Sequence, residues 1–366
     1  MMSNIKIPYI DLKMQYLPIH NEIMDAISNC LNNGSFILRG PLQELESKLS
    51  DYLGVSHVIG LNSGTDALFL SLKALNIGAG DEVITVSHTF VATISAIVHC
   101  GAKPVLVDIL EDGNIDVSLI EKNITKNTKA IIPVHMNGKA CDMESIMEIS
   151  RNYGISIIED AAQAFGGSYG VKKLGSYGVT GCFSLHPMKQ LSVPGDGGFV
   201  ATSDDAIAER IRVLGNHGQQ DKNTILEFGY NSRLDSLHAA VALVKLKYLD
   251  QYIARRREIA RIYCYMLKNC KQVILPKISK NDTVSSFVIK VDDRDKLLSH
   301  LNNCGIECFS HWRTPNHLQN GLNLDNFKLN QTEKLSNTVI SLPCYPEISN
   351  KEVKEVSNEI LNYYYP

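Results

Sequence analysis

Two side chains with complementary chemistry stand out in the sequence. Lys189 follows the stretch 184–188, and Asp160 comes two residues after the end of the apolar run 155–158. A lysine amine can form a Schiff base with an aldehyde, and a carboxylate after a buried strand can keep a pyridine nitrogen protonated. This is the pair that pyridoxal 5'-phosphate requires as an electron sink. A lone lysine before glycines is more often a surface charge, so the interpretation needs support from other segments.

A phosphate site is indicated by residues 62–66, with the sequence NSGTD. The segment follows a predicted strand and opens a helical pattern. Gly64 lets the backbone approach a ligand closely, Thr65 supplies a hydroxyl, and the N–H groups of a helix start favour an anion. If the turn before Lys189 doubles back, the hydroxyl of Ser184 reaches the same phosphate. An ordinary N-cap followed by a helix is the alternative.

Two further side chains are candidates for contact with a heteroaromatic ring. Phe90 follows the run 83–86, at the carboxyl edge of the predicted sheet, where open α/β folds bind their ligands and an aromatic side chain can stack. Gln163, three residues after Asp160, is placed to reach a phenolic oxygen of the ring. The alternatives are that Phe90 belongs to the core and that Asp160 only caps a helix.

The elements that position these residues follow from hydrophobic periodicity. Short β-branched runs alternate with helical patterns at residues 58–61, 83–86, 105–107, 131–134 and 155–158. Such a pattern predicts an α/β fold with a mostly parallel central sheet that helices cover on both faces. Before it, Leu42, Leu45, Leu49 and Leu53 form one stripe of an amphipathic helix that ends at Gly54.

Three parts of the chain are expected. Residues 1–32 form an N-terminal helical segment that packs near the small domain, residues 33–250 form the large cofactor-binding domain, and residues 251–366 form a smaller α+β domain. The small domain contains a strand at 286–291 and a closing helix from Lys351.

Two local patterns are set aside. Residues 255–257 are three consecutive arginines, which on a helix point about 100° apart, so we interpret them as a solvated face without a catalytic role. Tyr169 and Lys173 have the spacing used by short-chain dehydrogenases, but the first strand–helix unit lacks G-x-G-x-x-G. Residues 167–175 are instead predicted to form a hairpin.

Composition narrows the class of partner. The chain of 366 residues carries 36 basic and 39 acidic side chains, a net charge of −3, which favours neither nucleic acid nor a membrane surface. Nine cysteines without C-x-x-C spacing indicate reduced thiols and no metal site. The start of the chain lacks the apolar core of a signal peptide, and the run 91–110 is interrupted by charged residues. We therefore expect a cytoplasmic protein with a small-molecule substrate.

The segments described above resemble, in the same order, a known family. They include residues 36–41, 63–68, 80–84, 89–93, 159–163 and 229–233. The likeness is to the DegT/DnrJ/EryC1/StrS family of sugar aminotransferases, which are pyridoxal phosphate enzymes of fold type I. It runs from about residue 7 to residue 360, nearly the whole chain.

The resemblance implies a role for each cofactor residue. Lys189 would hold the cofactor as a Schiff base and move the proton, while Asp160 would face the ring nitrogen and Gln163 the ring hydroxyl. An asparagine at the position of Asn231 reaches the phosphate of the neighbouring subunit, which implies a homodimer with composite active sites. The other implied contacts are stacking by Phe90 and phosphate binding by Gly64, Thr65 and Ser184.

Residues 311–319, HWRTPNHLQ, match the family segment H-Y-P-x-P-x-H-L-Q that lies near the sugar. The chain departs from it with Trp312 for tyrosine and Arg313 for proline. The substrate contacts that we expect are His186, His311, Trp312, Arg313 and His317.

The implied reaction is amino transfer from glutamate to a nucleotide-linked keto sugar, in amino-sugar biosynthesis for a surface polysaccharide such as lipopolysaccharide O-antigen or for a glycosylated metabolite. Residues 195–198, GDGG, look more like relatives that aminate C-3, whereas C-4 relatives often carry glutamate at the position of Asp196. Two alternatives share the fold. A sugar dehydratase carries histidine in place of Lys189, and a non-catalytic regulator need not retain the lysine, acid, glutamine and serine together.

Overall fold

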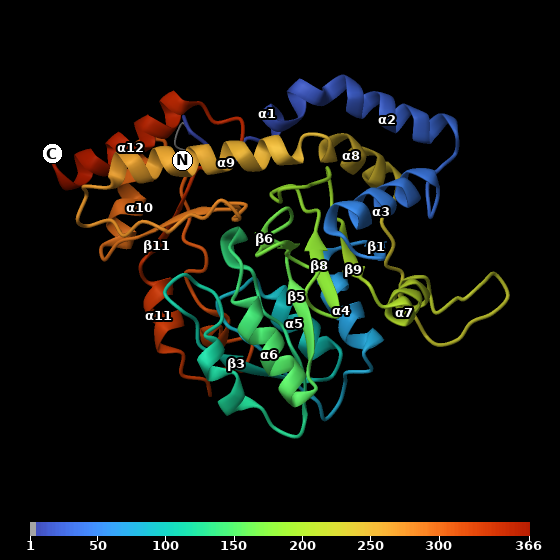
Figure 1. Ribbon diagram of the computed structural model, residues 1–366. Coiled ribbons are helices and arrows are strands. Elements are labelled where there is room, and N and C mark those ends of the chain that lie inside the picture. Colours follow the sequence, from blue (N-terminus) through green and yellow to red (C-terminus); the bar gives the residue numbers. More distant parts are fainter. Residues whose placement is uncertain (1–4) are drawn as a thin grey trace.

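The computed structural model describes residues 5–366 and has a central seven-stranded sheet (Figure 1). In spatial order the strands are β1 (His57–Leu61), β9 (Gly198–Thr202), β8 (Thr180–Ser184), β5 (Ser156–Asp160), β4 (Thr128–Ile131), β2 (Glu82–Val86) and β3 (Lys103–Val107). β9 pairs antiparallel with β1 and β8, and the other neighbours are parallel. The predicted mostly parallel α/β sheet is confirmed.

Helices cover both faces of this sheet. Adjacent residues of a strand point to opposite faces, so Val58 and Ile59 enter different core clusters. One face carries α4 (Gly64–Ala74), α5 (Ala92–His99) and α7 (Asp205–Gly215). The other carries α3 (Gly40–Leu53), α6 (Met143–Tyr153) and α8 (Ser236–Leu246).

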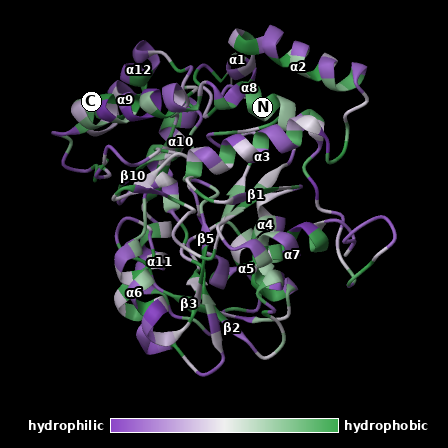
Figure 2. Ribbon diagram, turned by 45° about the vertical axis from the view of Figure 1, so that its right-hand side comes forward, coloured by the Kyte–Doolittle hydropathy of each residue, from purple (hydrophilic) through white to green (hydrophobic). Residues whose placement is uncertain are grey.

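The helix α3 confirms its predicted leucine stripe. All four leucines are buried, and the helix ends at Gly54, whose φ of 69° is left-handed and suits glycine. Figure 2 shows α3 with alternating hydrophilic and hydrophobic residues, as expected of a helix with one buried face.

The small sheet pairs β10 (Phe287–Lys290) with β11 (Val339–Leu342) in antiparallel register. Its core also takes in α9 (Leu249–Leu267), α10 (Arg294–Asn303) and α12 (Asn350–Tyr364), whereas α11 (Asn330–Ser336) packs on the large domain through Leu335. The long helix α9 joins two cores, because Ile253 packs in the large-domain cluster and Tyr263 in the small-domain cluster. The predicted boundary at residue 250 falls in the first turn of this helix.

The N-terminal segment divides between the two cores. Ile7 belongs to the small-domain cluster, whereas Ile19 and Ile23, at the start of α2 (His20–Asn32), pack on Val241 and Val244 of α8. The helix α2 therefore packs on the large domain. This differs from the prediction that it would pack near the small domain.

The remaining elements are short. They are α1 (Leu12–Tyr16), the strands β6 (Ser168–Tyr169) and β7 (Lys172–Lys173), and 3-10 turns at Leu17–Ile19, Val117–Leu119, Glu121–Asn123, Met136–Gly138 and Asn316–Leu318. The antiparallel pair of β6 and β7 confirms the predicted hairpin. Among residues 5–366, the helices are all too short or too polar to cross a bilayer.

A buried lysine ties the loop that carries Lys189 to two helices. Lys245 in α8 is 1% exposed, and its Nζ donates to Gln15 Oε1 in α1 at 2.9 Å and to the hydroxyl of Ser192. The ring of Tyr16 lies 4.7 Å from the same Nζ. Burial lowers the pKa of Lys245 to about 7. Since Ser192 comes three residues after Lys189, the hydrogen bond from Lys245 to Ser192 anchors the loop that carries Lys189.

We expect Lys245→Met to change how stability depends on pH. An unfolded lysine has a pKa of about 10.4, so between pH 7 and pH 10 the unfolded chain binds more protons at this position than the folded chain. The free energy of unfolding of the wild type should therefore rise with pH relative to the variant, by up to about 1.4 kcal/mol per pH unit. Denaturant titrations at pH 7.5 and 9.5 measure the difference.

The matched control is Lys48→Met, which removes an exposed lysine of α3. It should follow the wild type at both pH values. Parallel profiles for Lys245→Met and the wild type would mean that Lys245 keeps an ordinary pKa in the folded protein.

Candidate active site

A cavity of about 360 Å³ lies at the carboxyl ends of the central strands. Ten of the thirteen predicted site residues line it. They are Gly64, Thr65, Phe90, Asp160, Gln163, Ser184, His186, Lys189, His311 and Trp312. The carboxyl edge of a parallel sheet gathers residues that are far apart in sequence, which explains why these segments meet.

Lys189 lies in the loop between the antiparallel strands β8 and β9. Its backbone N–H donates to the carbonyl of His186 at 2.9 Å. The next side chain, Gln190, is buried and donates to the carbonyl of Gln163 at 2.7 Å and to Thr283 Oγ1 at 3.0 Å. Burial lowers the pKa of the Lys189 amine, which increases its neutral, nucleophilic fraction.

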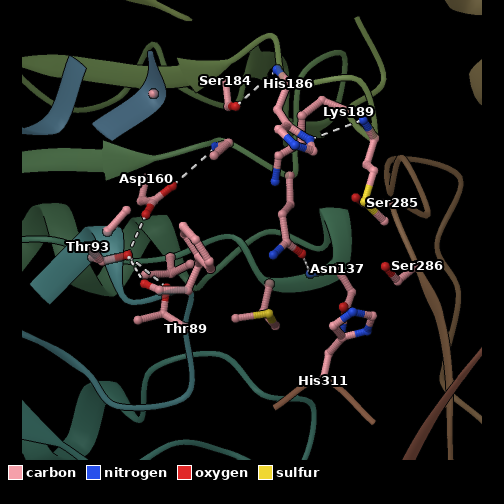
Figure 3. A pocket seen from close by; sticks show the side chains of 18 of the residues that line it. Thr89, Thr93, Asn137, Asp160, Ser184, His186, Lys189, Ser285, Ser286 and His311 are labelled. Atoms are coloured by element: carbon pink, nitrogen blue, oxygen red, sulfur yellow. Dashed lines mark hydrogen bonds between the residues drawn. The ribbon is translucent and has the colours of Figure 1, made fainter. Parts of the chain in front are cut away.

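Asp160 ends β5 and is 6% exposed. Its Oδ2 accepts from Thr93 Oγ1 at 2.8 Å, and its Oδ1 accepts from the backbone N–H of Ala162 at 3.2 Å (Figure 3). Burial raises the pKa of Asp160, while the bond from Thr93 and the charge of Lys189 oppose that rise. A buried carboxylate is costly unless it is paired, so a cationic N–H is the partner that this position favours.

The neighbouring Glu159 is fully buried and holds the end of β5 in place. Its carboxylate accepts from backbone N–H groups within residues 175–178 at 2.6 to 2.8 Å and from His135 Nε2 at 3.0 Å. The N–H of Cys141 donates to His135 Nδ1, which places the proton of the ring on Nε2. The backbone N–H of His135 in turn donates to the carbonyl of Asp160 at 3.1 Å.

The start of α4 forms a cradle against the end of β8. Ser63 caps the helix by accepting from the N–H of Asp66 at 3.0 Å. A Cβ on Gly64 would lie 2.8 Å from the Cβ of Ser184, so only glycine allows this approach. The first turn of a helix offers N–H groups without intrahelical acceptors, and Thr65 and Ser184 add hydroxyls beside them. This combination suits a phosphate.

Aromatic and amide groups form the remaining walls. Phe90 is 55% exposed, and its ring centroid lies 5.7 Å from that of Trp312. Gln163 Oε1 accepts from the backbone N–H of Asn137 at 2.9 Å, which leaves the amide NH₂ as the donor toward the cavity. Burial and the nearby charge of Lys189 lower the pKa values of His186 and His311.

Three predicted residues lie outside the cavity that the described chain forms. Asn231 is exposed. Arg313 is exposed and pairs with Asp295 at 3.3 Å. His317 is buried, with its Nδ1 2.8 Å from Ser87 Oγ and its Nε2 3.3 Å from a carboxylate oxygen of Glu333. Since both ring nitrogens of His317 are engaged, its position favours a structural role over the predicted substrate contact.

The interpretation of residues 255–257 as a solvated face is wrong. Arg256 is 4% exposed, lines the cavity, and donates to the carbonyls of Ser285 and Cys344. A signal was available in the sequence, because Arg256 lies between Ile253 and Ala260 on the buried stripe of α9. Thr93 was missed as well, since a threonine inside a helical pattern carries no sign of its partner.

These residues fit pyridoxal phosphate. The cavity offers an amine for its aldehyde, a buried carboxylate for its ring nitrogen, an amide donor for its ring oxygen and a helix start with hydroxyls for its phosphate. When bound, the cofactor supplies an electron sink that stabilises negative charge at the carbon next to an amine.

Comparison with known proteins agrees with this chemistry. The model of the DegT/DnrJ/EryC1/StrS aminotransferase family matches residues 18–361. A dTDP-3-amino-3,6-dideoxy-alpha-D-galactopyranose transaminase from Aneurinibacillus thermoaerophilus is 40% identical over 98% of this chain and 100% of its own. A UDP-2-acetamido-2-deoxy-3-oxo-D-glucuronate aminotransferase from Pseudomonas aeruginosa is 37% identical over 97% of this chain and 100% of its own.

The fold of the chain is also similar to that of solved aminotransferase structures. The crystal structure of DesV from S. venezuelae, in complex with a ketimine intermediate, superposes with a TM-score of 0.95 at 36% identity, covering 98% of this chain and 99% of DesV. Two other structural neighbours are NtdA from Bacillus subtilis, solved with the bound cofactor PMP, and Spr1654 from Streptococcus pneumoniae, solved in a PLP form.

We expect Lys189→Ala to abolish amino transfer while leaving the fold intact, because Lys189 is the one lysine among the described residues that line the cavity, and its loss removes the amine that would bond the aldehyde and move the proton. Borohydride treatment, which fixes a Schiff base, should label the wild type with the cofactor on the peptide that contains Lys189 and leave the variant unlabelled. Lys172→Ala, on the exposed hairpin, is the control and should behave as the wild type. Full activity in Lys189→Ala would refute the assignment.

We expect Asp160→Asn to keep the shape of the site but slow amino transfer by orders of magnitude, since the charge that holds the ring nitrogen protonated is removed. Thr93→Val removes one hydrogen bond to that charge, worth about 1.5–3 kcal/mol, so it should slow the reaction about tenfold to a hundredfold. Single-turnover rates with glutamate measure both. An unchanged rate in Asp160→Asn would mean that another residue faces the ring nitrogen.

Proposed function

Since the chain belongs to the DegT/DnrJ/EryC1/StrS aminotransferase family, and is a pyridoxal-phosphate-dependent aminotransferase, we propose that it transfers an amino group from glutamate to C-3 of a nucleotide-linked keto sugar. The observation that carries the proposal is the meeting of Lys189, Asp160 and the start of α4 in one cavity. We place the reaction in amino-sugar biosynthesis, for a surface polysaccharide or a glycosylated metabolite, in the cytoplasm.

In this proposal each side chain has one task. Lys189, as a neutral amine, would take the proton from the α-carbon of the donor and return it to the carbon that carries the cofactor's aldehyde. Asp160, supported by Thr93, keeps the proton on the ring nitrogen, and Gln163 donates to the ring oxygen. Phe90 covers one face of the ring. The donor leaves as 2-oxoglutarate before the sugar enters, so the kinetics are ping-pong.

Two observations support C-3 over C-4. The names of the relatives from Aneurinibacillus thermoaerophilus and Pseudomonas aeruginosa both place the reacting group at position 3 of the sugar. Asp196, the residue of the GDGG segment at which C-4 relatives often carry glutamate, lines the cavity. The two names carry different nucleotides, dTDP and UDP, so the proposal leaves the nucleotide open.

The sugar contacts are proposed for His186, His311 and Trp312, which line the cavity beside Lys189. His311 Nδ1 lies 3.0 Å from Ser341 Oγ, which fixes the orientation of its ring. The pKa values of both histidines are lowered, so at neutral pH they act as uncharged hydrogen-bonding groups.

We expect the enzyme to convert 3-keto nucleotide sugars faster than 4-keto ones. The assay supplies glutamate with a panel of dTDP and UDP keto sugars and follows 2-oxoglutarate. It can be run in reverse from 3-amino and 4-amino nucleotide sugars with 2-oxoglutarate. Higher kcat/KM for the 4-substituted series would refute C-3 amination, and turnover of none of the sugars would refute the substrate class.

A homodimer with composite sites is the second part of the proposal. Residues 216–235, which connect α7 to α8 and include Phe228 and Asn231, form a segment that projects from the large domain beyond α7 in Figure 1. Phe228 is 100% exposed, Ile225 67% and Leu226 57%. A cluster of exposed apolar side chains marks an interaction surface. Asn231 lies at the base of this segment, where it pairs with Asn216, and its exposed side chain does not line the cavity of its own chain. Such a position suits a residue that completes the phosphate site of a partner.

We expect two inactive variants to complement each other. Lys189→Ala damages one half of a composite site, and Asn231→Asp places a carboxylate against a phosphate in the other half. Random pairing of equal amounts gives mixed dimers as about half the population, each with one intact site. Activity should therefore appear when the two are refolded together.

The complementation test requires that Asn231→Asp alone is severely impaired, which is measured first. Subunit exchange is confirmed with differently sized tags. Activity that stays at the level of the separate variants despite exchange would show that each site is built from one chain.

A further inference from the structure

A second group of side chains with ligand chemistry lies in the small domain. His300 and Cys304 come from α10 and its C-terminal cap, and Glu359 comes from α12. The Cys304 Sγ lies 3.8 Å from His300 Nε2 and 3.6 Å from Glu359 Oε2, and the last two atoms are 3.7 Å apart. Three different donor atoms thus form a nearly equilateral triangle.

The fold presents these three side chains to one point. Residues four apart on a helix share a face, which places His300 and Cys304 side by side. The helices α10 and α12 lie beside each other, so Glu359 faces the pair (Figure 1). The side chains of His300 and Glu359 are 33% and 31% exposed, which leaves the triangle accessible from solvent.

A packed neighbour limits the freedom of the histidine. The Tyr363 ring lies 5.2 Å from the His300 ring, and its hydroxyl donates to Asp293 Oδ2 at 2.8 Å. Tyr363 also packs against the small-domain core. The ring of His300 is therefore held against α12, with its Nε2 toward Cys304 and Glu359.

The distances suit a small tetrahedral cation. With bonds of about 2.3 Å to sulfur and about 2.0 to 2.1 Å to nitrogen and oxygen, tetrahedral ligand atoms are separated by about 3.3 to 3.6 Å. The observed triangle is only slightly larger and would contract around an ion. Calcium and magnesium prefer oxygen ligands, whereas a thiolate, an imidazole and a carboxylate together select zinc among the common divalent ions.

We propose that His300, Cys304 and Glu359 form a zinc site, with water as the fourth ligand. On binding, the thiol of Cys304 releases its proton to solvent, the zinc ion loses coordinated water, and nothing is oxidised or reduced. The charges balance, because a thiolate and a carboxylate neutralise a divalent ion while His300 stays neutral.

The site would clip α10 to α12. The start of the described chain also packs beside the site, because the backbone N–H groups of Lys6 and Ile7 donate to the carbonyl of Gly305, next to Cys304. A ligand that binds only the folded state stabilises it by mass action, so zinc should stabilise the small domain. No metal site was predicted from the sequence, because Glu359 lies 55 residues after Cys304 and the ligands lack a C-x-x-C pair.

The test uses untagged holoenzyme that has been treated with a chelator and then titrated with Co²⁺ as a spectroscopic substitute for zinc. Tetrahedral Co²⁺ absorbs at longer wavelengths than the pyridoxal cofactor, so binding is visible in the loaded enzyme. We expect one equivalent of Co²⁺ to produce these bands and one equivalent of zinc to displace it. Zinc should also raise the thermal unfolding temperature.

Cys304→Ser should bind at least about tenfold more weakly, since losing even an outer partner of a metal ligand costs that much. Cys264→Ser, a partly buried thiol on α9 of the same domain, is the matched control and should titrate as the wild type. His300→Gln gives a second loss without touching a thiol. Retained cofactor absorbance shows that each variant is folded. Absence of the bands in the wild type, or equal binding by wild type and Cys304→Ser, would overturn the proposal.

Discussion

Two adjacent carboxylates are buried at the end of β5, and the site depends on how their charges are compensated. Because neighbouring strand residues point to opposite faces, Glu159 and Asp160 meet different surroundings. Burying an ion costs several kcal/mol, and each hydrogen bond to a charged group returns about 1.5–3 kcal/mol. Glu159 accepts from three backbone N–H groups and from His135, so its charge is fully satisfied within the protein. Asp160 accepts from Thr93 and Ala162, which leaves lone pairs for a ligand.

The loop between β8 and β9 positions Lys189 in the same cavity as Asp160. It connects two antiparallel strands, so it must reverse direction, and Leu185 N donates to Gly197 O at 2.8 Å where the loop closes. A Cβ on Gly198 would lie 2.3 Å from the backbone of Ser63, so the same reversal brings the loop against the start of α4. Two hydrogen bonds then hold the loop in place, one from Gln190 to the carbonyl of Gln163 and one from Lys245 to the hydroxyl of Ser192. The amine and the phosphate cradle are thus positioned by one turn of the chain.

The sequence was sufficient wherever local periodicity and burial coincide. The strands from β1 to β5, the leucine stripe of α3 with its stop at Gly54 and the hairpin at residues 167–175 were all predicted within a few residues. The antiparallel direction of β9 was not, because a short apolar run carries no sign of its direction. The engagement of His317 with Ser87 depends on a partner 230 residues away, which no local pattern reveals, whereas the burial of Arg256 could have been inferred from its place on the apolar stripe of α9.

Burial also explains why this cavity favours its ligand. Desolvation raises the pKa of Asp160 and lowers that of Lys189, so both charged forms are disfavoured, although each charge partly stabilises the other. A group that brings a protonated ring nitrogen to Asp160 and an aldehyde to Lys189 relieves both costs together, since one residue gains a cation and the other becomes part of a covalent bond. Asp160 and Lys189 break the usual rules of burial at a site where a bound partner would satisfy them. In the proposed assignment, Asp160 and Lys189, which are both costly to bury in charged form, would therefore contribute to the free energy of cofactor binding.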